Sequence, residues 1–112
     1  MKEINLPESL EKIGKNCFSL SELKSIIIPP KITTIETEVF YRCRHLAKVI
    51  LPEGLINIED CCFLETSLMG IVIPNSVENI GVNVFPKDTL ILRPANDYPK
   101  SILVTNVFRE QL

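Results

Sequence analysis

Hydrophobic residues recur along the chain in one fixed order. The clearest marker is a phenylalanine that returns at Phe18, Phe40, Phe63 and Phe85, at intervals of 22, 23 and 22 residues. Before each phenylalanine come an apolar residue and a proline, and then two apolar residues three positions apart. A fixed period between 20 and 50 residues is typical of solenoids, in which each repeat forms one layer of a stack.

Each repeat predicts one short strand. Aliphatic triplets precede a proline, as Ile26, Ile27 and Ile28 precede Pro29. Because side chains alternate along a strand, we expect Ile26 and Ile28 to point inward and Ile27 outward. Proline lacks an N–H and should end the pairing. The apolar positions after it favour an irregular or 3₁₀ return, with phenylalanine in the middle of the layer.

The repeat as a whole runs Leu-x-x-Ile-x-Ile-Pro-x-x-Ile-x-x-Ile-x-x-x-x-Phe. This pattern resembles the BspA-like family of leucine-rich repeats, over residues 1 to about 93. Gly14 and Gly81 match a glycine of the family, whereas Glu36 and Glu59 replace it, so the turn there need not be left-handed. The resemblance implies a surface or secreted protein that binds other proteins and carries no catalytic residues.

The predicted fold is therefore a leucine-rich-repeat solenoid of the α/β type, with about four repeats and mostly short parallel strands joined by loop or 3₁₀ returns. Residues 1–93 are expected to form the solenoid. Because Pro94 breaks the repeat, residues 94–112 are expected to form a C-terminal capping segment. Whether residues 101–112 add a strand or a helix stays open.

The outward positions of the strands predict a partner-binding surface. Ile27, Ile50 and Val72 should stack as an apolar ladder, and such patches often mark interaction sites. The alternative is that β-branched residues are favoured in any strand, whatever faces them. Beside the ladder, the same surface is expected to include the neighbouring residues Met69, Ala47, Lys24 and Lys48.

The first repeat predicts a strand at Ile4, Asn5 and Leu6, aligned with Ile26 to Ile28. No polar cap precedes it, although solenoids need one at each end. An unpaired strand edge invites pairing with another chain. Ile4, Asn5 and Leu6 are thus a candidate self-association edge of a homo-oligomer, or the chain is part of a longer protein.

Composition narrows the function classes. The net charge is −2, which gives no basic footprint for nucleic acid or an anionic membrane. The sequence contains no run of about 18 apolar residues, so no membrane span is predicted. Residues 1–7 lack the apolar core of a signal peptide. The compartment stays open, because the family resemblance favours the cell surface and a free thiol favours the cell interior.

The candidate chemistry is sparse. The four cysteines include no Cys-x-x-Cys pair, and His45 is the single histidine, so no metal site, cofactor site or nucleophilic triad is predicted. Cys17, Cys43 and Cys62 are predicted to be small buried hydrophobes. Cys61 aligns with polar residues of the other repeats and is predicted to be an exposed free thiol.

His45 lies between Arg42 and Arg44 in the turn after Phe40. This basic cluster is either a small anion or partner site, or a solvated loop, and the loop is favoured. The leading hypothesis for the whole chain is a non-enzymatic protein-binding module that uses the strand face for an unidentified protein partner. The alternative is a structural spacer or self-assembling segment of a longer surface protein.

Overall fold

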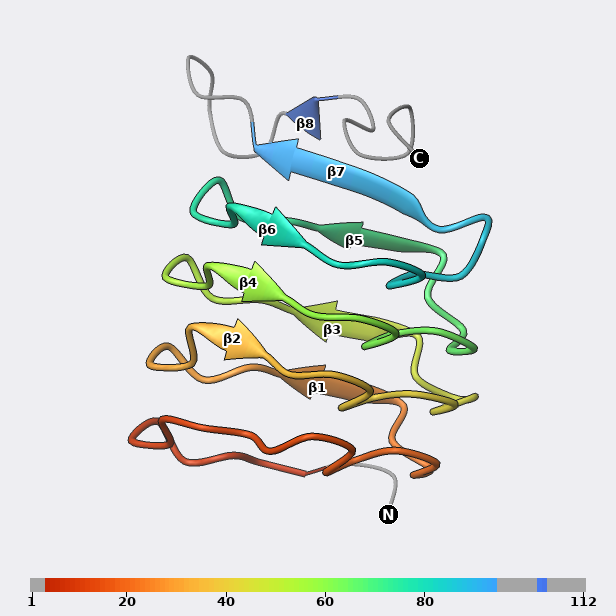
Figure 1. Cartoon of the computed structure of the whole chain (residues 1–112), viewed down its shortest axis with the longest axis horizontal. Helices are drawn as coiled ribbons and strands as arrows, with labels where there is room; N and C mark the ends of the chain where they lie inside the picture. Colours follow the sequence, from red (N-terminus) through yellow and green to blue (C-terminus); the bar gives the residue numbers. More distant parts are fainter. Residues whose placement is uncertain (1–3, 95–102, 105–112) are drawn as a thin grey trace.

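The computed structural model describes residues 4–94 and 103–104 as a stack of layers, which rises from the N-terminal layer to the last strands (Figure 1). Each layer runs along one face of the stack and returns along the other. The strands are β1 (Ser25–Ile27), β2 (Thr34–Ile35), β3 (Lys48–Ile50), β4 (Asn57–Ile58), β5 (Gly70–Val72), β6 (Asn79–Ile80), β7 (Leu90–Pro94) and β8 (Leu103–Val104).

One face of the stack is formed by β1, β3, β5 and β7. The pairs β1–β3 and β5–β7 are parallel, and β3 lies next to β5. The predicted parallel strands are thus confirmed, although each of the first three begins one residue earlier than expected. Ile28 still belongs to the pairing, because its N–H donates to the Ile50 carbonyl at 2.9 Å.

The return face carries a second sheet that the sequence did not predict. Strands β2, β4 and β6 pair in parallel, with Thr34 opposite Asn57 and Asn57 opposite Asn79. Their side chains are also joined, because Asn79 Nδ2 donates to Asn57 Oδ1 at 2.7 Å and Asn57 Nδ2 to Thr34 Oγ1 at 3.1 Å. These two-residue strands correct the expected return, which is otherwise made of turns and irregular chain, as where the Ile32 N–H donates to the Pro29 carbonyl at 3.2 Å. The described residues contain no helix, so the α/β label does not apply to them.

The core lies between the two faces. Ile26, Val49 and Ile71 point into it from β1, β3 and β5, as the alternation predicted. The core also contains a stack of aromatic rings. The centroids of successive rings from Phe18 through Phe40, Phe63 and Phe85 lie 5.6, 5.4 and 5.7 Å apart. Their planes diverge by 8° or less, so the rings are parallel and offset, a favourable arrangement for aromatic pairs.

The left-handed residue of each turn is not at the glycine position. No glycine in the described residues has a positive φ. Non-glycine residues take this conformation instead. One set comprises Asn16 (φ 60°), Glu38 (59°), Cys61 (59°) and Asn83 (52°), and a second set, four residues after the first three of these, comprises Leu20 (65°), Arg42 (59°) and Glu65 (61°). At Glu38 this orientation lets the backbone N–H donate to the Asp60 carbonyl of the next layer, at 3.1 Å. The left-handed residue thus contributes a hydrogen bond between layers.

The first layer departs from the prediction. Residues 4–6 belong to the layer beside β1 (Figure 1), but they form no strand. The expected strand at Ile4, Asn5 and Leu6 was therefore wrong. Ile4 and Leu6 are half-buried and Asn5 is exposed. In the described part of the chain the first layer has a neighbouring layer on one side only. A strand at residues 4–6 could therefore form hydrogen bonds with β1 alone. The layer is joined to the next one in its turn, where the Phe18 N–H donates to the Val39 carbonyl at 3.0 Å, but no described backbone hydrogen bond joins residues 4–6 to β1.

The C-terminal segment is described only in part. Leu103–Val104 forms β8, which runs antiparallel to β7 with Val104 opposite Arg93. This agrees with the strand alternative for that position. The rest of the predicted capping segment, residues 95–102 and 105–112, lies outside the described residues. The division into residues 1–93 and 94–112 stays a prediction.

Candidate functional site

The outward side chains of the front strands form one surface, here called the strand face. It contains the ladder Ile27, Ile50 and Val72, which are 66%, 46% and 41% exposed although they are aliphatic. These residues point outward because they alternate with buried residues of the same strands. The predicted neighbours are also exposed on this surface: Met69, Ala47, Lys24 and Lys48.

The register brings the ladder together. Ile27 lies directly opposite Ile50 in the β1–β3 pair. Val72 lies opposite Leu92 in the β5–β7 pair, so the column continues to Leu92, and the exposed Leu90 lies beside it. Leu90 and Leu92 were not among the residues predicted for this surface. The shorter last repeat hid their alignment, since Leu92 follows Val72 by fewer residues than the usual period.

Charge on the strand face has one sign. Residues 24–29, 47–51, 69–73 and 90–94 include no Asp or Glu. Lys24 and Lys48 are both exposed there and flank the ladder. The acidic residues of the described part of the chain therefore lie outside these four segments. The strand face is therefore apolar with a basic margin.

A groove of about 350 Å³ adjoins the ladder at its N-terminal end. It lies between the first layer and β1, where the expected strand pairing is missing. Ile4 and Leu6 form one side, Ile27 and Ile28 the other, and Glu8 is at its margin. The remaining lining residues are Asn5, Ser25, Ile26, Pro29 and Pro30. Ile27 thus belongs to both the ladder and the groove.

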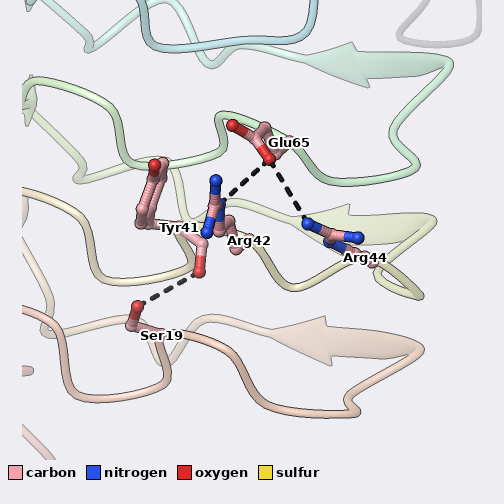
Figure 2. Close-up of polar contacts among 5 residues, drawn as sticks. All are labelled: Ser19, Tyr41, Arg42, Arg44 and Glu65. Carbon is pink, nitrogen blue, oxygen red and sulfur yellow. Dashed lines mark hydrogen bonds and ion pairs between the residues drawn. The ribbon is translucent and has the colours of Figure 1, made fainter.

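A carboxylate balances Arg42 and Arg44, the two arginines of the basic cluster (Figure 2). Glu65 Oε1 of the next layer lies 3.1 Å from Arg42 Nε and 3.8 Å from an Arg44 guanidinium nitrogen. The Arg42 guanidinium also lies 5.5 Å from the centre of the Tyr41 ring. Both arginines therefore already face an anion, and His45 is exposed. This geometry favours the solvated loop over an anion site.

The four cysteines are all free thiols, and two of the four burial predictions hold. Cys43 and Cys62 are buried as predicted. Cys17 is exposed, so its predicted burial was wrong. The sulfur of Cys62 is covered by carbonyls of the layer beneath, with Glu36 O at 3.0 Å. Cys17 belongs to the first described layer and has no such cover. Cys61, predicted to be exposed, is half-buried.

Burial also controls thiol reactivity. Desolvation raises the pKa of the Cys62 thiol to about 12, against the lowering effect of its hydrogen bond to the Glu59 carbonyl. Cys62 therefore stays protonated at ordinary pH, and the thiolate is the reactive form.

We expect a colour-forming disulfide reagent to modify Cys17 rapidly in the native protein, and Cys61 more slowly. Cys43 and Cys62 should react only as fast as the protein unfolds, because both are buried. The reaction is followed by absorbance at neutral pH. In the control variant Cys17→Ser, the fast phase should disappear. A fast phase that survives this substitution would contradict the assigned exposures.

Two other kinds of site are absent from the described residues. Among the described residues, no group of three or more His, Cys, Asp or Glu side chains is arranged to hold a metal ion. In the same residues, no helix has the length and apolar character needed to cross a membrane.

The chain was compared with known families, proteins and structures. Residues 1–91 match the BspA type Leucine rich repeat region, in 6 copies. That number differs from the four or so repeats expected from the phenylalanine spacing. No curated protein and no solved structure matches the chain significantly. Because the family match covers residues 1–91 of 112, the chain belongs to the BspA-type leucine-rich repeat family.

Proposed function

We propose that this chain is a protein-binding module and that the strand face is its binding surface. Families of leucine-rich repeats generally mediate protein interactions or surface roles, which makes binding the expected activity. The observation that carries the proposal is the ladder itself. Three aliphatic side chains in successive layers are each more than 40% exposed, and such contiguous apolar patches mark interaction sites.

The composition of this face also suits binding. Met69 is 83% exposed, and flexible methionine side chains adapt to the shape of a partner. The strands that carry these side chains pair in parallel, and their other face packs on the core. This packing makes the surface rigid. A rigid surface loses little entropy on association, which favours affinity. No residue here is proposed to be catalytic.

The test is a selection of displayed random peptides on the wild-type protein, followed by affinity measurements on variants. We expect the Ile27→Lys/Ile50→Lys double variant to lose at least about tenfold in affinity for the selected peptides, as central apolar contacts usually do. The matched control is Val82→Lys, since Val82 is 63% exposed but lies after β6 on the return side. Circular dichroism must show that both variants remain folded.

The proposal fails if the selected peptides bind the double variant as well as the wild type. It also fails if Val82→Lys is equally damaging, because the loss would then not be specific to the strand face.

A second candidate is end-to-end self-association through the first layer. Cys17 is exposed and Phe18 half-buried, whereas Val39 and Phe40 in the same slots of the next layer are fully buried. A further layer from another copy would cover them. Light scattering over about a tenfold range of concentration tests this candidate, because association is concentration-dependent. A constant monomer mass would remove it, and a growing mass that Cys17→Asp abolishes would support it.

A further inference from the structure

The first layer and β1 leave an unpaired strand edge open to the groove. Lys24 and Ile28 direct their backbone groups to β3, because the Lys24 carbonyl accepts from Ala47 N–H and the Ile28 N–H donates to Ile50, both at 2.9 Å. Backbone groups alternate along a strand, so those of Ser25 and Ile27 point the other way, toward the first layer. No hydrogen bond from residues 4–8 reaches them within the described part of the chain.

The groove and the ladder form one continuous apolar track. Ile27 lines the groove and also begins the ladder, which continues to Ile50 and Val72. Successive layers of parallel strands lie about 4.8 Å apart, so these three residues extend over roughly 10 Å. An extended peptide of about eight residues covers this distance and the groove together. The groove volume of about 350 Å³ is large enough for one aromatic or aliphatic side chain.

Charge identifies the occupant further. The residues that flank the ladder on the strand face are Lys24 and Lys48, and the front strands carry no acidic residue. Glu8 also lines the groove, so the part of a ligand that enters the groove should not be acidic. A ligand should therefore carry acidic residues beside the ladder and an uncharged apolar residue in the groove.

We infer that the track binds an extended, acidic segment of a partner protein, with one large apolar side chain inserted into the groove between the first layer and β1. This inference rests on the proposed function and specifies the class of partner. Charge complementarity of this kind contributes mainly to specificity and to the rate of association. Because the track crosses the strands instead of running along β1, the ligand is held by side-chain contacts and not by pairing with the edge of β1.

The probe is a fluorescein-labelled peptide of about eight residues in which aspartate alternates with leucine, with one phenylalanine near an end, so that it reaches beyond the track at both ends. Two control peptides replace aspartate by lysine, or the leucines and phenylalanine by serine. Fluorescence anisotropy measures their affinities at low and high salt. We expect the acidic peptide to bind at least about tenfold more tightly than either control, and salt to weaken it.

Two variants test the two parts of the track. The double variant Lys24→Glu/Lys48→Glu should reverse the preference between the acidic and basic peptides. The control is Lys15→Glu/Lys87→Glu, which changes two exposed lysines in turns and should leave the preference unchanged. Asn5→Trp, which places a ring in the groove, should weaken the acidic peptide about tenfold and keep the charge preference.

Several results would overturn the inference. They are equal binding of acidic and basic peptides, no binding of the acidic peptide, or no effect of Asn5→Trp. If the acidic peptide fails while library-selected peptides still require Ile27 and Ile50, the proposed function stands and only the partner class is wrong. If the selected peptides also ignore Ile27 and Ile50, the proposed function itself is rejected.

Discussion

Replacing Phe63 by alanine should cost about 3–5 kcal/mol of the free energy of unfolding, the usual loss for a buried phenylalanine. Phe63 is completely buried and stacks on two rings, with centroids 5.4 Å away at Phe40 and 5.7 Å away at Phe85. The truncation would leave a cavity in the middle of the stack and remove both ring contacts. Because a domain of this size has about 5–15 kcal/mol of stability in total, the variant should be close to unfolding.

Phe18→Ala is the matched control for this substitution. Phe18 occupies the same slot of the first layer but is half-buried and has one ring neighbour, Phe40, at 5.6 Å. Its loss should therefore be clearly smaller. Urea unfolding followed by far-UV circular dichroism gives both free energies. Equal losses at Phe18 and Phe63 would contradict the view that the rings in the middle of the stack hold the layers together.

Gly81→Ala should destabilise the protein by roughly 2–4 kcal/mol, the sum of overpacking and one lost hydrogen bond. A Cβ atom at Gly81 would lie 2.2 Å from Asp60 Oδ1 and 2.8 Å from the Asp60 backbone nitrogen. Moving the carboxylate away would break its hydrogen bond from the Val82 N–H, which is 2.9 Å long. The backbone contact would remain, so the two layers must also separate.

Gly14→Ala is the control, since Gly14 occupies the same position in the first repeat. A Cβ atom there meets nothing within 4 Å. Its effect should be neutral or stabilising by about 0.4–1 kcal/mol, through the reduced entropy of the unfolded chain. Asp60→Ala should restore part of the stability lost in Gly81→Ala, because it removes the nearer of the two clashes. If both glycine variants unfold at the same urea concentration, the proposed close approach at Gly81 is wrong.

One part of the candidate site could be predicted from the sequence, and another part is decided by the tertiary structure. Alternation along the strands was sufficient to predict that Ile27, Ile50 and Val72 point outward, and the structure confirms their exposure. The groove was not predictable from the sequence, because it exists only where residues 4–6 fail to pair with β1. That failure depends on the spacing of two layers, which no residue pattern encodes.

The cysteines illustrate the same division. Cys17 and Cys62 occupy the same slot of their repeats, so the sequence predicted one environment for both. The structure buries Cys62 and exposes Cys17, because the side chains of one layer are covered by the carbonyls of the layer beneath. Burial in a stack thus depends on the position of the layer as well as on the residue.

By itself the sequence determined the repeated layer, since a period of 22 or 23 residues with fixed apolar positions can bury its side chains only by stacking on copies of itself. It also determined the parallel strands of the front face and the inward and outward alternation of their side chains. Contacts between layers decided the rest. These features are the side-chain hydrogen bonds that join Thr34, Asn57 and Asn79, the close approach at Gly81, and the groove beside β1. These features depend on distances between segments about one repeat apart, which tertiary packing sets and local sequence does not.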